Sequence, residues 1–253
     1  MITKKTQQDI EKLRVGGSRL ATVLEKVSKK VAPGVTTGEL DAYAQELIAE
    51  YGDVPAFLNY TPEGASFPYP AALCVSINDE VVHGLPGNRV IREGDIVSID
   101  CGIKHDGLFT DSARTVIVGS GTKKERLMLE TAWCALDAGI AAARVGNKTG
   151  DIGAAIEAVI RPHGFGIIRD LAGHGVGHKI HEDPFIPNYG KKGTGTKLEA
   201  GMVVALEPMI TLGGEDVIVA TDGYTLKTRD GSRAVHTEHT IVITDGDPEI
   251  LTA

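Results

Sequence analysis

Apolar residues recur at helical spacing along the first part of the chain. Successive members of this series lie three, four or seven positions apart, which places their side chains on one face of an α-helix. The series consists of Ile10, Leu13, Leu20, Leu24, Val27 and Val31. The pair Pro33-Gly34 follows, and both residues favour the end of a helix. The pattern predicts an amphipathic helix that ends at Pro33-Gly34.

The next helical pattern occurs twice in the chain. Residues 37–52 and 149–164 both begin with Thr-Gly, an acidic residue and an apolar residue, and both close near a glycine. The offset between the two segments is 112 positions at both ends, 149 − 37 and 164 − 52. Each segment predicts a helix, and the constant offset indicates an internal repeat.

Further similarities follow in the same order. Residues 82–86 and 180–184 share the pattern apolar-His-x-x-Pro. Residues 93–100 and 200–207 share a glycine followed by an apolar run that ends in a carboxylate. Each half therefore contains a helix, a histidine, a glycine turn, an apolar strand and an acid.

A third pair, Asp111 and Glu238, precedes strand-like segments in the two halves. We expect an α+β fold with two similar α/β halves, about residues 34–118 and 146–244, related by a pseudo-twofold axis.

The segment 96–118 has the pattern of a β-hairpin. Its dipeptide Asp106-Gly107 is typical of a two-residue type I′ turn. In the register set by that turn, His105 faces Leu108 and Asp111 lies opposite Gly102.

This register brings two carboxylates onto one face. Asp100 shares a face with Gly102, so Asp100 and Asp111 are diagonal neighbours about 7–8 Å apart at their backbones. Gly102 is expected to leave room between them. A slip of one residue would separate the two acids. Cys101 alternates with Asp100 and is expected to be a packed thiol that points away.

The remaining candidate ligands lie in the second half. Glu207 closes the apolar run 202–206, and a buried acid there must be paired, protonated or bound to a metal. His174 lies in the glycine-rich segment 171–178, where the missing side chains let the backbone approach a crowded centre. The predicted metal ligands are Asp100, Asp111, His174, Glu207 and Glu238. Their carboxylates would repel one another unless cations neutralised them.

Four carboxylates with one imidazole predict a site for two divalent metal ions. Mn, Fe, Co and Zn all suit this donor set, so the ligands do not select one of them. Two such ions can activate water and polarise a carbonyl, which is the chemistry of amide hydrolysis.

The other histidines differ in their sequence context. His83 and His181, the repeat-related pair, precede turn-like sequences that contain proline. We expect both to contact the substrate as neutral hydrogen-bond donors rather than to bind metal. The rest lack such context and are expected to be surface or structural residues: His105, His163, His178, His236 and His239.

Composition narrows the setting. The chain has 253 residues, 42% of them hydrophobic, which suffices for a substantial core. A formal net charge of −8 argues against DNA or RNA binding, which needs a basic surface. Three cysteines without CxxC spacing favour reduced thiols and the cytoplasm. Because no stretch of about 18 apolar residues and no signal peptide is found, we expect a protein outside the membrane.

Seven short motifs together resemble one known family. They lie at residues 76–84, 100–102, 110–113, 173–177, 181–184, 206–208 and 237–240. Over about residues 5–251 the chain is similar to methionine aminopeptidases of type I. Only 33 positions separate His174 from Glu207 (207 − 174), so the large insertion of the type II branch is missing.

The resemblance implies a pita-bread fold, in which a curved antiparallel sheet encloses a dinuclear metal site, formed by a single domain of residues 1–253. It implies a cytosolic enzyme that removes the initiator methionine from nascent proteins and peptides when the second residue is small. We expect a monomer, and the ribosome is a further partner that the resemblance leaves open.

The family's functional residues map onto matching positions of this chain. By match of motif, its metal ligands are the five residues predicted above, and its substrate-contacting histidines are His83 and His181. Glu207 is expected to act as general base toward the attacking water and then as general acid toward the leaving amine. His181 is expected to stabilise the developing oxyanion, and His83 to position the leaving amide.

The chain departs from the family pattern near the expected methionine pocket. Phe67-Pro68 stands where relatives often carry His-Gly, Ile180 replaces a frequent Phe, and Tyr224 replaces a frequent Trp. The wall stays apolar or aromatic, so these changes concern the shape of the pocket. Tyr69, Cys74 and Tyr224 are the candidate pocket residues, with an ordinary core role as the alternative.

Three alternatives remain open. The first is an X-Pro aminopeptidase or prolidase of the same fold, although those relatives usually carry an additional N-terminal domain. The second is a pita-bread protein that binds peptides without catalysis. The third is a hydrolase of a small guanidino compound on this fold.

Overall fold

The computed structural model describes residues 2–62 and 64–253. Its helices are α1 (Gln7–Lys30), α2 (Thr37–Glu50), α3 (Lys123–Ala142), α4 (Thr149–Ile160) and the short 3₁₀ helix η1 (Arg161–His163). The predicted N-terminal helix is confirmed as α1, which ends at Lys30 because Val31 is extended. The predicted repeated helices are confirmed as α2 and α4.

Capping explains where the helices begin. In α1, α2 and α3 a threonine precedes the helix and accepts the N–H of the third helical residue, whose carboxylate accepts the threonine N–H. Such a capping box satisfies backbone groups that the helix itself leaves unpaired. Helix α4 keeps part of this arrangement, since Asp151 accepts the backbone N–H of Lys148.

The largest sheet is antiparallel. Its path runs β1 (Val54–Pro55), β4 (Ile96–His105), β5 (Leu108–Ile117), β14 (Glu238–Val242), β9 (Val203–Leu206), β7 (Ala172–Gly175) and β8 (Glu182–Pro187). Strand β2 (Leu73–Ile77) pairs with β4, and β15 (Glu249–Ile250) pairs with β14. Strands of the first and second halves of the chain meet where β5 pairs with β14.

Two smaller sheets complete the structure. One contains β13 (Ala234–His236), β10 (Met209–Thr211) and β6 (Gly166–Ile167). The other contains β11 (Val217–Val219), β12 (Leu226–Thr228) and β3 (Glu80–Val82). The second sheet thus joins a strand of the first half to a hairpin near the C-terminus.

The β4–β5 hairpin has the predicted register. His105 faces Leu108, and Gly102 faces Asp111. Asp106 and Gly107 have φ angles of 49° and 87°, so both turn residues lie in the left-handed region that a type I′ turn requires. The prediction drawn from Asp106-Gly107 is therefore confirmed.

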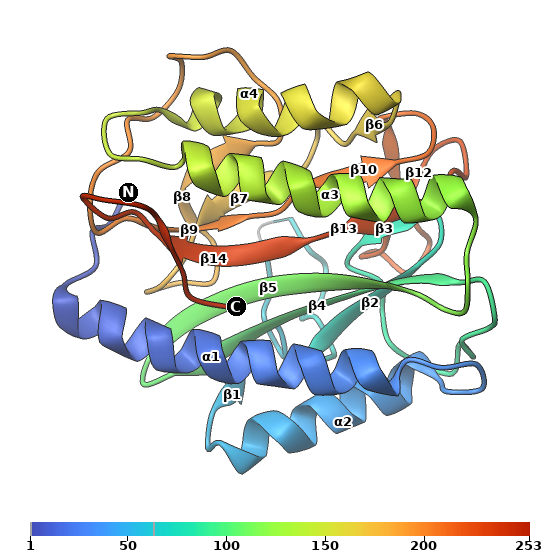
Figure 1. Ribbon diagram of the computed structural model, residues 1–253. Helices are drawn as coiled ribbons and strands as arrows, with labels where there is room; N and C mark the ends of the chain where they lie inside the picture. The colour runs from blue at the N-terminus through green and yellow to red at the C-terminus, as the bar shows by residue number, and fades with distance from the viewer. Residues whose placement is uncertain (1, 63) are drawn as a thin grey trace.

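Each half of the chain packs a helix pair on its own strands. Helices α1 and α2 bury Leu20, Leu24 and Leu40 in one apolar cluster with β2 and β4. Helices α3 and α4 bury Met128 and Ile156 in another cluster with β9 and β14. Figure 1 shows the two helix pairs on opposite sides of the view with the strands between them.

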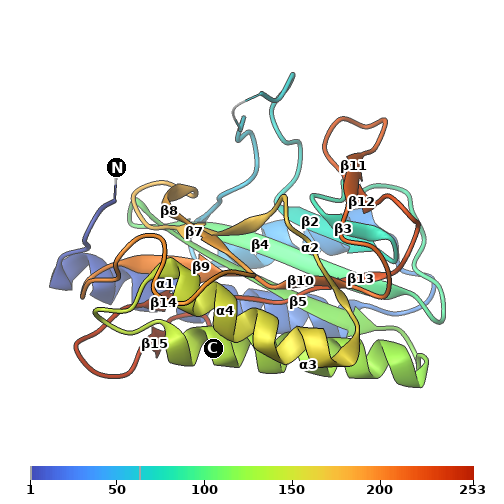
Figure 2. The same cartoon turned by 90° about the horizontal axis from the view of Figure 1, so that it is seen from above.

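Loops project on the other side of the large sheet from α3 and α4. Figure 2 shows the segment that precedes β2 and the connection between β11 and β12 rising on this side. The α+β architecture with a curved antiparallel sheet agrees with the predicted fold class. Among the described residues, no helix has the length and apolar character needed to cross a membrane.

Candidate active site and metal centre

Strand pairing places three carboxylates on one face of the large sheet. Asp100 on β4 and Glu238 on β14 are both register partners of Ala113 on β5. Asp111 lies two residues before Ala113 on the same strand, so its side chain points to the same face. Ala113 carries only a methyl group in the middle of this row. The three acids therefore converge across neighbouring strands.

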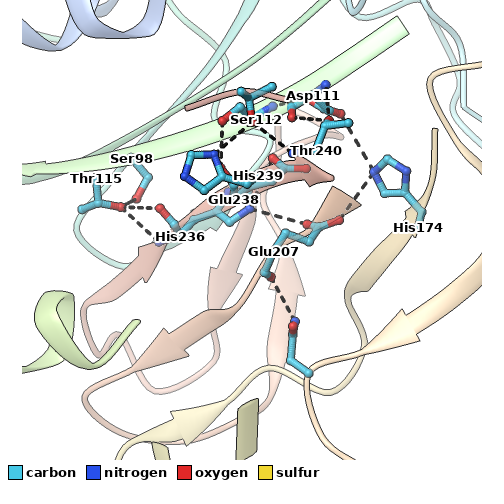
Figure 3. A network of polar contacts seen from close by, with 12 residues as sticks. Ser98, Asp111, Ser112, Thr115, His174, Glu207, His236, Glu238, His239 and Thr240 are labelled. Carbon is cyan, nitrogen blue, oxygen red and sulfur yellow. Dashed lines mark hydrogen bonds and ion pairs between the residues drawn. The ribbon is translucent and has the colours of Figure 1, made fainter. Parts of the chain in front are cut away.

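The second half contributes the other two candidate ligands. His174 on β7 pairs with Ala205 on β9, and Glu207 directly follows β9. Nε2 of His174 lies 3.6 Å from Oε1 of Glu207 and 3.9 Å from Oδ2 of Asp111. Figure 3 shows His174, Glu207 and Asp111 pointing toward one another.

The structure brings all five predicted ligands together. Three groups of residues each offer ligand atoms within 4.8 Å of one another: Asp100 with Asp111 and Glu238, His174 with Glu207 and Glu238, and Asp111 with His174 and His181. The inclusion of His181 shows how near this histidine stands to the cluster. The role of the five residues as metal ligands stays a prediction.

Burial makes the carboxylates hard to ionise together. Asp100, Asp111 and Glu238 are buried, and Glu207 is half-buried. Burial and the charge of Glu207 raise the pKa of Asp111 to about 8, and burial raises the pKa of Glu207 to about 8. Burial and the neighbouring acids also raise the pKa of Asp100 and of Glu238 well above their usual range.

His174 has the protonation state of a metal ligand. Its Nδ1 lies 2.9 Å from the carbonyl oxygen of Gly175, so Nδ1–H donates and the lone pair of Nε2 faces the carboxylates. Burial lowers the pKa of His174 to about 3, so the ring is neutral near pH 7. A ligating histidine commonly fixes its second nitrogen in this way.

Divalent cations fit this donor set. Oδ1 of Asp100 is buried without a hydrogen-bond partner among the described residues, and a buried polar atom of this kind calls for one. Carboxylate oxygens with one imidazole suit Mn, Fe, Co or Zn. Positive charge at this point would also relieve the repulsion that raises the four acidic pKa values.

A cavity of about 180 Å³ opens directly from the carboxylates. Its lining includes the three predicted pocket residues Tyr69, Cys74 and Tyr224. The hydroxyl of Tyr69 lies 3.0 Å from the carbonyl oxygens of both Leu73 and Gly84. Val82, Leu171 and Ala172, which lie in motifs noted in the sequence, also line the cavity, together with residues that had no sequence signal: Phe57, Tyr60, Pro62 and Met209.

The two predicted substrate histidines line the same cavity. His83 follows β3 with a φ of 59°, a strained conformation for a residue other than glycine, and such strain often marks functional sites. Burial lowers the pKa of His83 to about 4. His181 is exposed at the rim, and its Nδ1 lies 3.1 Å from the hydroxyl of Tyr60.

Phe67 and Ile180, which were expected to affect the shape of the pocket, act on it through neighbouring residues. Neither is among the described residues that line the cavity. Phe67 packs edge-on against Tyr224, whose hydroxyl donates to the Phe67 carbonyl. Ile180 packs against Gly102 of β4. A Cβ on Gly102 would stand 3.1 Å from Cδ1 of Ile180 and 2.8 Å from Cβ of Ala56.

The function expected for Gly102 therefore needs correction. Its missing side chain makes room for apolar neighbours, because Ala56 and Ile180 fill that space. The sequence could not assign these neighbours, which come from distant segments. Asp100 and Asp111 are diagonal neighbours, as the register required, because Asp100 faces Ala113 and Asp111 faces Gly102.

One histidine was missed by the sequence interpretation. His236, expected to be a surface or structural residue, is buried with its Nε2 3.5 Å from Oε2 of Glu207 and 4.0 Å from Oε2 of Glu238. Figure 3 shows its ring beside Glu207. A signal was present, because His236 stands two positions before Glu238, a spacing that places both side chains on one face of an extended chain.

The site and the fold define a class of protein. The family model of metallopeptidase family M24 matches residues 11–245. Because this match covers most of the chain, the chain belongs to metallopeptidase family M24.

Individual relatives are more specific. The chain is 47% identical to the methionine aminopeptidase of Aquifex aeolicus over 252 residues, which cover 98% of this chain and 97% of that protein. The crystal structure of methionine aminopeptidase from Thermotoga maritima superposes with a TM-score of 0.96 at 42% identity, covering 100% of this chain and 99% of that chain.

A prolidase from Pyrococcus furiosus shares the fold more distantly. It superposes with a TM-score of 0.76 at 25% identity, covering 99% of this chain but 65% of the prolidase chain. The pita-bread fold expected from the sequence is therefore confirmed.

Proposed function

We propose that this chain is a methionine aminopeptidase that removes the N-terminal methionine of nascent proteins and peptides when the second residue is small. The observation that carries this proposal is the convergence of Asp100, Asp111, His174, Glu207 and Glu238 at the inner end of a largely apolar cavity. Full-length relatives at 47% and 42% identity bear that name.

The five converging residues would hold two divalent cations. Mn, Fe, Co and Zn all fit these donors, and the chemistry of the ligands does not choose among them. When bound, the cations would activate water and polarise the carbonyl of the scissile bond.

The protein supplies the proton transfers. Glu207 stands beside His174 and His236 at the cavity wall, where its carboxylate can take a proton from water and return it. As general base, Glu207 takes a proton from the attacking water at a carboxylate oxygen. It then returns this proton to the amine of the leaving peptide.

The two rim histidines act on the substrate. With the Tyr60 hydroxyl donating to Nδ1 of His181, Nε2 of His181 carries the proton and donates to the developing oxyanion. His83 is neutral because burial lowers its pKa, and its N–H positions the leaving amide. The free α-amine of the substrate would lie beside Asp111, which explains why only the first residue is removed.

The methionine side chain would occupy the apolar part of the cavity. Tyr69, Cys74 and Tyr224 form its wall, and they offer sulfur and aromatic surface to a thioether. The rings of Tyr69 and Tyr224 meet edge-on with centroids 5.1 Å apart, which gives this wall a fixed shape.

The organisation of the protein belongs to the same proposal. We take residues 1–253 as one catalytic domain with an internal repeat, about 34–118 and 146–244. Helices α2 and α4, which begin 112 positions apart (149 − 37), support the repeat.

The three unpaired cysteines support a reducing compartment, the cytoplasm. The proposed enzyme acts as a monomer on N-terminal methionine, with the ribosome as a candidate partner.

A peptide assay tests the proposed function. Protein stripped of metal is titrated with Mn, Fe, Co or Zn while it hydrolyses Met-Ala-Ser, and an X-Pro peptide serves as the competing substrate. We expect methionine release that saturates at about two equivalents of metal. Release of X from X-Pro without methionine release would instead establish the prolidase alternative, and no hydrolysis of either peptide would favour a binding protein.

A substitution tests the role assigned to Glu207. Glu207→Gln keeps the shape of the side chain but removes its ability to take a proton, so kcat should fall by at least about 100-fold while KM changes little. An unchanged kcat would reject Glu207 as the general base.

A further inference from the structure

A buried ion pair joins the N-terminal segment to the rim of the active site. Nζ of Lys5 lies 2.7 Å from Oε2 of Glu182, and the two side chains are 1% and 5% exposed. The neighbouring pair of Lys4 and Glu199 has side chains that are 58% and 47% exposed. Removing two charges from water costs free energy, so the Lys5–Glu182 contact differs in kind from the surface pair beside it.

Further hydrogen bonds hold Glu182 in place. Its carboxylate accepts the hydroxyl of Thr3 at 2.6 Å and the backbone N–H of Lys179 at 2.8 Å. The backbone N–H of Lys5 donates to the carbonyl of Gly201 at 2.7 Å. The N-terminal segment is thus attached both to the first residue of β8 and to the turn before β9.

Gly177 shows how closely Lys5 fits this loop. A Cβ on Gly177 would stand 2.2 Å from Cε of Lys5, and the φ of Gly177 is 138°. On the other side, the Gly177 carbonyl accepts the backbone N–H of Phe109 at 2.7 Å. The loop is therefore held between the lysine side chain and the first residues of β5.

His181 directly precedes Glu182 in this loop. This residue is exposed at the cavity rim. Its ring lies 3.1 Å from the Tyr60 hydroxyl and meets the His174 ring edge-on with centroids 4.5 Å apart. Thr3, His181 and Glu182 also line one hollow next to the main cavity. The contacts with Tyr60 and His174 orient the ring, whereas Glu182 fixes the backbone from which the ring projects.

We propose that Lys5 is a positioning residue, which holds His181 at the reacting carbonyl through its buried contact with Glu182. This inference rests on the proposed function of the site. Lys5 touches neither the candidate metal ligands nor the cavity, so it acts only by placing the loop. Loss of the cation leaves the Glu182 carboxylate with the Thr3 hydroxyl and one backbone N–H.

A double-mutant cycle tests this inference. Lys5→Met, His181→Ala and the double variant are compared with the wild type in Mn-loaded hydrolysis of Met-Ala-Ser. We expect Lys5→Met to lower kcat by about tenfold to 100-fold with KM within about twofold, as a small misplacement of a reacting group does. In the His181→Ala background the same change should alter kcat by less than about twofold, because the group that Lys5 positions is already gone.

Matched variants separate positioning from folding. Lys4→Met removes the neighbouring exposed cation and should keep wild-type kcat, and Lys5→Arg should restore most of the activity. Thermal unfolding and calorimetric Mn binding are measured for every variant. Lys5→Met should unfold at a lower temperature than the wild type, because it leaves a buried carboxylate without its cation, but it should stay folded at the assay temperature and bind Mn like the wild type. If Lys5→Met does not fold, Glu182→Gln, which neutralises the same pair from the other side, takes its place in the cycle.

The outcomes distinguish this inference from the function on which it rests. Equal losses of kcat in the wild-type and His181→Ala backgrounds would overturn it, as would wild-type kcat for Lys5→Met. Wild-type kcat for His181→Ala would overturn it as well, since nothing would be left to position, while methionine release would still support the proposed function. A wild-type protein that releases no methionine would reject both.

Discussion

Nε2 of His236 lies 3.5 Å from Oε2 of Glu207, and the histidine is 1% exposed. Neither ring nitrogen has a hydrogen-bond partner among the described residues. Burial lowers the pKa of His236 to about 3, so the ring is neutral and carries one N–H. With its proton on Nε2, the ring needs only a small movement to complete a hydrogen bond to Glu207.

We predict that His236→Leu lowers kcat/KM by about tenfold to 100-fold, the usual cost of removing a partner that orients a metal-binding side chain. The reason is that Glu207 loses the buried imidazole that lies 3.5 Å from its Oε2. Steady-state kinetics with Met-Ala-Ser measures the effect. His163→Leu, at an exposed position on η1, is the control and should leave kcat/KM unchanged. Equal activities for the two variants would contradict the prediction.

Removal of metal should abolish hydrolysis. The binding of metal should depend on the clustered acids. We expect Asp111→Asn to weaken Mn binding by at least about tenfold, because it removes a charged oxygen ligand. Isothermal titration calorimetry measures affinity and stoichiometry. Asp137→Asn, on the exposed surface of α3, is the matched control. Identical binding curves for the two variants would remove Asp111 from the metal site.

The raised acidic pKa values predict how stability depends on pH without metal. Unfolded Asp and Glu side chains titrate near pH 4, whereas Asp111 and Glu207 titrate near pH 8 in the folded protein. Between these values the folded protein holds protons that the unfolded chain has released, so the free energy of unfolding falls as pH rises.

Buried histidines oppose this trend only at lower pH. The pKa values of His83, His174 and His236 are lowered by burial, so their contribution to stability grows as pH rises to about 6.5. The informative range is therefore pH 7 to 8. Urea unfolding should show a declining stability there for chelator-treated protein and a smaller decline for Mn-loaded protein, since cations stabilise ionised acids. The same decline in both forms would contradict the assignment of Asp111 and Glu207 as metal ligands.

Gly102→Ala should destabilise the protein by about 1–3 kcal/mol, the usual cost of overpacking. The added methyl group would stand 2.8 Å from Cβ of Ala56 and 3.1 Å from Cε1 of Phe57, and β4 would have to shift with Asp100. Chemical denaturation measures the loss. Gly87→Ala has open space around the new methyl group, and a loss of equal size there would point to a general glycine effect.

Tyr224→Phe should raise KM for Met-Ala-Ser by about twofold to tenfold with little change in kcat. The variant loses the hydroxyl that donates to the Phe67 carbonyl and ties the loop before β2 to the pocket wall. A neutral hydrogen bond contributes about 0.5–1.5 kcal/mol, which corresponds to this range. Tyr43→Phe on α2 is the control. A changed kcat with constant KM would show that Tyr224 acts on the reaction rather than on methionine binding.

The sequence by itself determined the local elements and the first half of the site. Apolar spacing predicted α1, and the repeated Thr-Gly-acid pattern predicted α2 and α4. Asp106-Gly107 was sufficient to set the hairpin register and so to place Asp100 beside Asp111. These features depend on backbone preferences that a few neighbouring residues encode.

Only the tertiary structure decided how distant segments meet. The pairing of β5 with β14 joins Asp111 to Glu238, and the burial of His236 and the contact between Lys5 and Glu182 follow from packing across the chain. Lys5 carries no local signal, because its role depends on Glu182, 177 positions away (182 − 5). Gly102 shows the same limit: its backbone position was predictable, whereas the apolar side chains that occupy its space were not.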